Sequence, residues 1–236
     1  MEFAGDLGRR TSAQLPGRSP NLMVPVGSIE QHGPHLPLDT DTRIASAVAA
    51  AAARELDLPV APAIAYGASG EHQSFPGTIS IGTPALHALL VEYGRSASDW
   101  AQRMVFVNGH GGNVEALHAA VTQLRGEGRD VAWCTPAVWR VHRPDAHAGH
   151  TETSVLLHLA PNLVRAGELR PGNLEPLADL MPRIRAGGVR AVSQSGVLGD
   201  PSTATAADGA RLFAEMVDDC VARVRRWRPQ GEGMLV

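Results

Sequence analysis

Short apolar runs and amphipathic stretches alternate along this chain of 236 residues, and the alternation limits the folds that it can adopt. Each apolar run has the length of a buried strand, and the stretch that follows has the spacing of a helix with one apolar face. Such repetition is typical of an α/β fold with a mostly parallel sheet and helices on both faces. The predicted strands are Leu22–Val26, Val60–Ala65, Met104–Val107 and Asp130–Trp133, with a further extended segment at Thr78–Ile81.

Predicted helices occupy much of the sequence between and after these strands. Asp39, Thr40 and Asp41 each offer a side chain that can cap the first helix. Pro, Gly and Leu are frequent from residue 165 to residue 190, where we expect irregular structure. No internal repeat or linker divides the chain, so we expect a single domain over residues 1–236, with residues 1–20 as an N-terminal extension. The predicted helices are Thr42–Glu55, Pro84–Arg103, Val114–Arg125, Glu152–Leu159 and Thr203–Arg226.

Charge and composition exclude several classes of function. The net charge of -3 argues against nucleic acid or an anionic membrane as the main partner. All 21 basic residues are arginine, which removes any mechanism based on a lysine Schiff base or a lysine general base. Two distant cysteines, Cys134 and Cys220, form neither a disulfide framework nor a CxxC zinc motif. Without a signal peptide or an apolar run long enough to cross a membrane, the expected location is the cytoplasm.

The segment from Gly27 to Asp41 follows the first predicted strand and is dense in groups that bind metals. It holds three carboxylates and two imidazoles, which are the usual ligands of hard and borderline divalent metals. Glu30 and His32 are separated by one residue, so an extended backbone points both side chains the same way. Asp41 begins the next helix, where a carboxylate either caps the helix or bridges two metals. Beside Glu30 and His32, the bridging interpretation is favoured.

Two further loops place histidines after predicted strands. His110 follows the third strand and lies among glycines, which leave room for a substrate. In the segment from His147 to Glu152, Glu152 either occupies the first turn of a helix or binds a metal. His147 is a candidate proton shuttle because imidazole titrates near neutral pH. His72 and His35 are weaker candidates, which we interpret as residues that support the site or its loops.

Ligands of α/β folds gather at the carboxyl ends of the strands, so we expect these three loops to converge on one site. The motifs HExxH and GxSxG and the P-loop signature are absent from the sequence. A mixed set of carboxylates and imidazoles suits a two-metal hydrolytic site. There the metals polarise a carbonyl and supply hydroxide near neutral pH, while a histidine carries protons to the leaving amine.

Taken together, these motifs resemble those of the creatininase-like metal-dependent amidohydrolases. The similarity extends from about Leu22 to Arg226, with several motifs in the family's order. It implies a three-layer α/β/α domain with a mostly parallel central sheet and a homo-oligomer such as a hexamer. It also implies two divalent metal ions per subunit (zinc, iron(II) or manganese) that serve the hydrolysis of a carbon–nitrogen amide bond. The segments that carry it are Glu30–Pro37, Asp41, Gly109–Asn113 and His147–Glu152, supported by Glu71–Thr78 and Gly199–Ser202.

The family's metal ligands can be carried over to the matching positions of this chain. By this resemblance, Glu30, Asp41 and His110 hold one metal. His32, Asp41 and a further carboxylate hold the second metal, with Asp41 bridging the two ions. In creatininase itself the further carboxylate lies two residues after the histidine that matches His110, where this chain has Gly112.

The departure at Gly112 speaks against creatinine as the substrate and makes Glu152 the expected replacement ligand. A weaker second site, or a single tightly held metal, is the alternative. We also expect Glu152 and His147 to act in catalysis, with His147 delivering a proton to the leaving nitrogen.

Within the family the chain is more similar to one branch, the creatininase-like peptidases of the mycofactocin biosynthetic system. The closer match covers Tyr66–Gln73, Val105–Asn113 and His147–Leu157. It implies a peptidase that releases a modified, Val–Tyr-derived C-terminal unit from a precursor peptide. We expect the loop Thr135–His147, with Trp139, to shape the pocket. A second hypothesis keeps the metal chemistry but takes a small cyclic amide or a formamide as substrate. A third is a non-catalytic metal-binding scaffold that holds a peptide without cleaving it.

Overall fold

The computed structural model describes residues 5–15, 19–136 and 145–236, and within them it confirms the predicted α/β architecture. The strands are β1 (Ser19–Val26), β2 (Ala101–Asn108), β3 (Val131–Cys134), β4 (Pro229–Gln230) and β5 (Met234–Leu235). They form one sheet in the order β1-β2-β3-β5-β4. All neighbouring pairs are parallel except β4 and β5, which are antiparallel.

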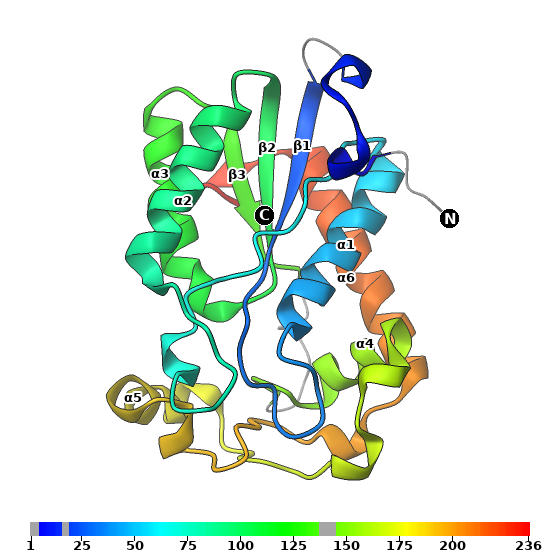
Figure 1. Cartoon of the computed structure of the whole chain (residues 1–236), viewed down its shortest axis with the longest axis vertical. Helices are drawn as coiled ribbons and strands as arrows, with labels where there is room; N and C mark the ends of the chain where they lie inside the picture. The colour runs from blue at the N-terminus through cyan, green and yellow to red at the C-terminus, as the bar shows by residue number, and fades with distance from the viewer. Residues whose placement is uncertain (1–4, 16–18, 137–144) are drawn as a thin grey trace.

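Helices cover both faces of this sheet, which gives the molecule three layers (Figure 1). The helices are α1 (Thr40–Leu56), α2 (Gly82–Ala97), α3 (Val114–Gly126), α4 (His150–Leu159), α5 (Leu177–Gly187) and α6 (Ala206–Arg226). Met23 and Val105 belong to a buried cluster with α1, α4 and α6, whereas Leu22 and Phe106 belong to a second cluster with α2 and α3. The strands are apolar on both sides because both sides are buried.

β1 and β2 end side by side, since Val26 pairs with Asn108. The loops after these strands therefore begin at the same edge of the sheet. Gly109 allows α1 to approach this edge, because a side chain there would collide with the carbonyl group of Asp41. Among the described residues, none of the helices combines the length and the apolar character that a membrane span requires.

α5 lies beyond the carboxyl ends of the strands, in a stretch for which the sequence predicted irregular structure. That prediction is wrong for residues 177–187. Pro182 removes one hydrogen bond inside the helix, but Leu180 and Ile184 are buried against Phe75 and Leu198. Tertiary packing of one apolar face outweighs the local cost of the proline.

Four other elements differ from the predictions. The strand predicted for Val60–Ala65 is reduced to isolated pairs with β1, because Pro59 and Pro62 lack the N–H groups that a ladder needs. The helix predicted for Pro84–Arg103 ends at Ala97, where the chain turns so that residues 101–103 can join β2. β4 and β5 were not predicted, since two residues each are too few to show a hydrophobic period.

Candidate metal centre

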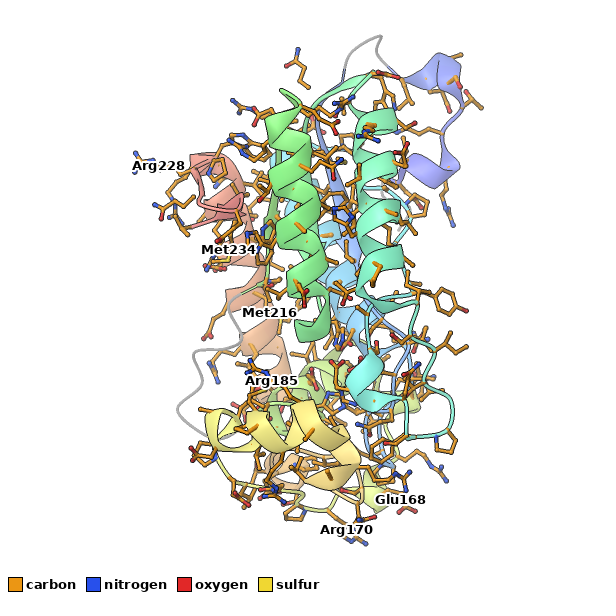
Figure 2. The ribbon with its side chains drawn as sticks, turned by 90° about the vertical axis from the view of Figure 1, so that its left-hand side faces the viewer. Glu168, Arg170, Arg185, Met216, Arg228 and Met234 are labelled. Atoms are coloured by element: carbon orange, nitrogen blue, oxygen red, sulfur yellow. The ribbon has the colours of Figure 1, made fainter. Side chains whose placement is uncertain are left out.

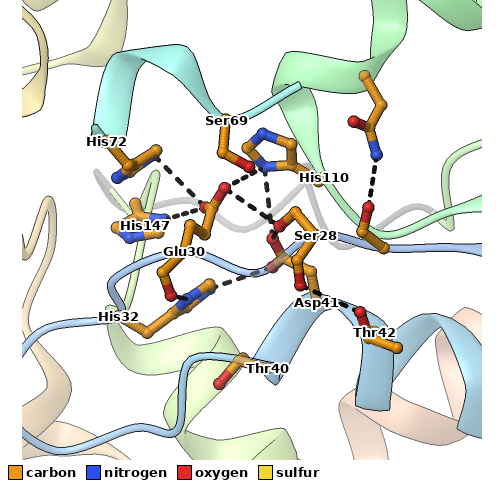
Figure 3. Close-up of polar contacts among 12 residues, drawn as sticks. Ser28, Glu30, His32, Thr40, Asp41, Thr42, Ser69, His72, His110 and His147 are labelled. Atoms are coloured by element: carbon orange, nitrogen blue, oxygen red, sulfur yellow. Dashed lines mark hydrogen bonds and ion pairs between the residues drawn. The ribbon is translucent and has the colours of Figure 1, made fainter. Parts of the chain in front are cut away.

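Three loops converge at the carboxyl end of the sheet and bring together six predicted site residues, all of which except Glu152 are labelled in Figure 3. The loop between β1 and α1 contributes two of them, and the first turn of α1 contributes a third. The fourth follows β2, and the last two flank the start of α4. The six are Glu30, His32, Asp41, His110, His147 and Glu152.

Glu30 lies at the middle of the centre and is fully buried. Its Oε2 atom lies 3.1 Å from Nδ1 of His110. Its Oε1 atom lies 3.4 Å from Nε2 of His72 and 3.6 Å from Nδ1 of His147, yet has no hydrogen-bond partner among the described residues. Burial, with the nearby charge of Asp41, raises the pKa of Glu30 to about 8 against the opposing effect of the histidines.

Asp41 lies between two histidines, in the position that a bridging ligand would take. Its Oδ1 atom lies 3.1 Å from Nε2 of His32, and its Oδ2 atom lies 3.3 Å from Nδ1 of His110. The Ser28 hydroxyl donates to Oδ2 of Asp41 and lies 3.1 Å from Oε2 of Glu30. Burial alone would raise the pKa of Asp41, but His32 and His110 hold it well below its usual value. Asp41 is therefore a carboxylate of the centre, while Asp39 occupies the N-cap position of α1.

Glu152 also lies near His32, since its Oε2 atom is 3.8 Å from Nε2 of that ring. The N–H of Ala148 donates to the same Oε2 atom at 2.6 Å. Ala148 has a positive φ of 52°, which is uncommon for a residue other than glycine and turns the backbone toward the carboxylate. The loop before α4 thus orients Glu152 toward the centre.

A divalent cation fits this set of donors. A buried carboxylate oxygen without a partner is costly, and within the described part of the chain Oε1 of Glu30 is such an atom. Burial would lower the pKa of His32, yet the surrounding carboxylates raise it to about 10, so positive charge is favoured here. Three sets of residues have donor atoms within 4.8 Å of one another: Glu30, Asp41 and His110; His32, His147 and Glu152; and Glu30, His72 and His147.

The first of these sets equals the one that the resemblance implies for one metal. The second contains His32 and Glu152, as expected, but has His147 in the place of Asp41. Gly112 leaves no room for the carboxylate that creatininase has at the matching position. A side chain there would meet the carbonyl oxygen of Ala68, Nε2 of His110 and Oε1 of Glu71.

Sequence reasoning overlooked Gln31. His72, expected to support the site, lies with its ring against Glu30 and contacts the Gln31 side chain. The sequence spacing between His72 and the other site residues gives no signal of its position. His72 lies in a separate Gly-rich loop, which follows the segment Val60–Ala65. His150 contacts Thr203 instead of the centre, and His35 contacts Thr153. The predicted pocket residue Trp139 lies outside the described residues.

The centre forms the floor of a cavity of about 820 Å³, within the size range of ligand sites. Asp41, His110 and Glu152 line the floor. One wall comes from α3 and the opposite wall from α5, which contributes apolar side chains and one arginine. Figure 2 shows α5 below α2 and α3, with Arg185 on it. The wall residues on α5 are Leu177, Met181, Ile184 and Arg185.

Comparisons with known proteins agree on one family. The family model of creatininase, described as creatinine amidohydrolase, matches residues 9–224. A protein of Mycobacterium tuberculosis (strain CDC 1551 / Oshkosh) named "Mycofactocin precursor peptide peptidase" is 64% identical over 100% of this chain and 96% of its own. One of the same name from Mycolicibacterium smegmatis (strain ATCC 700084 / mc(2)155) is 62% identical, with the same coverage.

Solved creatininases share the fold. A tryptophan-to-phenylalanine mutant creatininase superposes with a TM-score of 0.79 and 27% identity, over 94% of this chain and 98% of that one. Two others, named as a manganese form and as a mutant of Zn–Zn type, have TM-scores of 0.77 and 0.76 at 27% and 28% identity. The first covers 94% of this chain and 98% of its own, and the second covers 93% and 96%.

Proposed function

The chain belongs to the creatininase family, and we propose that it is a divalent-metal-dependent peptidase that cleaves a mycofactocin precursor peptide. It hydrolyses an amide bond and so releases the modified, Val–Tyr-derived C-terminal unit. One observation carries the metal dependence: an oxygen of the buried Glu30 carboxylate lies between two histidine rings and has no hydrogen-bond partner among the residues that the structure describes. The predicted single domain, homo-oligomer and cytoplasmic location stay predictions.

We propose two ions per subunit, chosen among zinc, iron(II) and manganese. Glu30, Asp41 and His110 would hold one ion, while His32, Asp41 and Glu152 would hold the other. When bound, such ions polarise the scissile carbonyl group and favour the ionisation of water near neutral pH. The Ser28 hydroxyl and the Ala148 N–H keep the carboxylates oriented through their hydrogen bonds.

His147 is the proposed proton carrier. Burial, followed by the charges of His32 and His72, holds the pKa of His147 well below its usual value. Its ring is therefore neutral at physiological pH and has a nitrogen free to accept a proton from the attacking water. The same nitrogen can then return the proton to the leaving amine. This cycle needs no other base from the chain.

A peptide fits the cavity better than a small cyclic amide does. The cavity is large, and the apolar side chains of Leu177, Met181 and Ile184 face the centre across it. Such a wall can pack against the side chains of a peptide on either side of the scissile bond. Relatives with the peptidase name are 62–64% identical over 98–100% of this chain, so the small-amide alternative is not favoured.

The test is mass spectrometry of the protein with a modified precursor peptide, with chelator and with each added metal. We expect a short C-terminal fragment only when metal is present. His110→Ala should lower its formation at least about 100-fold, because it removes a proposed ligand. His158→Ala, which changes an exposed histidine of α4, should leave it unchanged.

Two outcomes would contradict this function. A peptide that stays intact with zinc, iron(II) and manganese would favour the hypothesis of a small-amide substrate. A panel of cyclic amides and formamides would then be tested. A peptide that binds equally well after chelation and is never cleaved would instead support the scaffold hypothesis.

A further inference from the structure

Gln31 lies between two histidines of the centre, and its side-chain amide has a single possible orientation. Its Oε1 atom accepts the N–H of Gly33 at 2.9 Å, and its Nε2 atom donates to the carbonyl oxygen of Gly196 at 3.2 Å. Exchanging the two ends of the amide would set carbonyl against carbonyl and N–H against N–H. Gly196, with a φ of +82°, makes this approach possible, because a Cβ atom there would overlap the amide.

The backbone carbonyl group of Gln31 fixes which nitrogen of His147 carries the proton. Nε2 of His147 lies 2.7 Å from the carbonyl oxygen of Gln31. A carbonyl oxygen only accepts, so Nε2 must carry the hydrogen. In a neutral ring the other nitrogen then has none, and this bare Nδ1 atom faces Oε1 of Glu30 at 3.6 Å.

The proton of His72 follows from counting the hydrogens of the Gln31 amide. Nε2 of Gln31 has two of them, and Gly196 takes one. Nε2 of His147 also lies 3.0 Å from this amide nitrogen but already carries a hydrogen, so it cannot accept the other. The second hydrogen therefore points to Nδ1 of His72, at 2.8 Å. Nε2 of His72 carries the proton of that ring and lies 3.4 Å from Oε1 of Glu30.

We propose that Gln31 is a positioning residue that holds both rings in the Nε2–H tautomer, with opposite edges of the two rings nearest to Glu30. The nitrogen of His147 nearest Oε1 is then bare, whereas the nitrogen of His72 nearest the same atom carries a hydrogen, at 3.6 Å and 3.4 Å respectively. Only His147 can then accept a proton or bind a metal at this point, although the two rings lie just 4.3 Å apart. The effect on turnover rests on the proposed function, whereas the protonation of the rings does not.

The test is long-range nitrogen-15 NMR of histidine-labelled, zinc-loaded protein, repeated after chelation. His72→Asn and His147→Asn assign the two rings by loss of signal. In the wild type we expect the pattern of an Nε2–H ring for both histidines. Nδ1–H on His72 in the wild type would overturn the proposal.

Gln31→Glu separates the two rings. A carboxylate can keep the Gly33 contact but cannot donate, so His72 should gain a proton on Nδ1 while His147 keeps Nε2–H through the backbone carbonyl. Gln31→Met, which removes the amide at similar length, should give a mixture of His72 forms and serves if the charged variant fails to fold. Gln73→Glu adds the same charge at an exposed neighbour of His72 and should change neither ring.

Turnover separates a positioning role from a merely structural one. We expect Gln31→Glu to lower turnover of the peptide by about 10- to 100-fold, as for other residues that orient ligands, and Gln73→Glu to leave it within about twofold. Lost turnover with an unchanged His72 ring would overturn the proposal. If the wild-type rings are as expected and no peptide is cleaved, the proposed function fails and this inference stands.

Discussion

His35 is a buried side chain that affects the stability of the folded protein but has no role in the proposed reaction. The residue is fully buried, with Nε2 2.9 Å from the Thr153 hydroxyl and Nδ1 without a partner among the described residues. Burial, followed by the charge of His32, lowers the pKa of His35 to about 4 from its ordinary value of 6.5. The folded protein therefore keeps this ring neutral over a range in which the unfolded chain protonates it.

This difference predicts acid sensitivity. The unfolded chain binds the proton below pH 6.5 and the folded chain only below about pH 4, so the free energy of unfolding falls as the pH drops through that window. His35→Gln removes the titrating group. Between pH 7 and pH 5 it should lose about 2 kcal/mol less stability than the wild type in urea unfolding. His158→Gln is the exposed control, and parallel losses in wild type and His35→Gln would refute the prediction.

Most of the individual residues of the candidate centre could be predicted from the sequence. Glu30, His32 and Asp41 are close in sequence, so their chemistry could be recognised from spacing and density. The roles of Gln31 and His72 could not, because they depend on a contact between two loops and on the orientation of one amide. Ordinary loop residues gain such roles only from their neighbours in three dimensions.

The contact between α4 and α6 depends on a glycine. Gly209 is buried on α6 where that helix crosses α4, and a Cβ atom there would overlap the carbonyl oxygen of Ser154. The obstacle is backbone and cannot rotate away. α4 carries Glu152 in its first turn, so the close approach of these helices also supports the centre.

Gly209→Ala should therefore be destabilising, although alanine normally favours a helix. We expect a loss of about 3 kcal/mol in the free energy of unfolding, from forced separation of the two helices. Gly126→Ala is the matched control. Gly126 ends α3 with open space around it, and the change there should stabilise the protein by about 0.5 kcal/mol. Denaturant unfolding measures both, and equal effects of the two changes would contradict this explanation.

Helices and strands with a regular pattern of buried residues could be predicted from the sequence. A helix whose burial depends on a few distant partners could not. β1, β2 and α3 follow hydrophobic periods and were predicted within a few residues of their ends. α5 was missed because its composition indicates loop, while its stability comes from packing against Phe75 and Leu198. A single sequence carries no direct record of such distant partners.

Across the whole molecule, the cavity joins the sheet edge to a separate wall on α5. Leu177 begins that wall and is 37% exposed, so it can lose further apolar surface against a bound peptide. Leu177→Asp should raise KM for the precursor peptide about tenfold and leave kcat and zinc affinity unchanged. An aspartate at the first residue of a helix is favourable, so the fold should survive.

Leu174→Asp is the matched control for this prediction. Leu174 lies three residues earlier, is 51% exposed, and does not line the cavity. Its replacement should leave KM unchanged. An equal rise of KM in both variants would mean that α5 has no specific contact with the peptide.

The three-layer α/β architecture was predicted correctly, because alternation of strands and helices is a property of the whole chain. The wall of the cavity on α5 was not predicted, since the sequence indicates irregular structure where this helix lies. Fold and centre are therefore more accessible from sequence than the surface that receives the substrate.

The position of α6 in the chain has a consequence for biosynthesis. Every proposed ligand, from Glu30 to Glu152, leaves the ribosome before α6, which covers one face of the sheet together with α1 and α4. Until α6 arrives, that face exposes apolar side chains of α1, and the α4 turn bearing Glu152 lacks its main support. We therefore expect the centre to reach its full metal affinity only once α6 has been synthesised and has packed against α1 and α4.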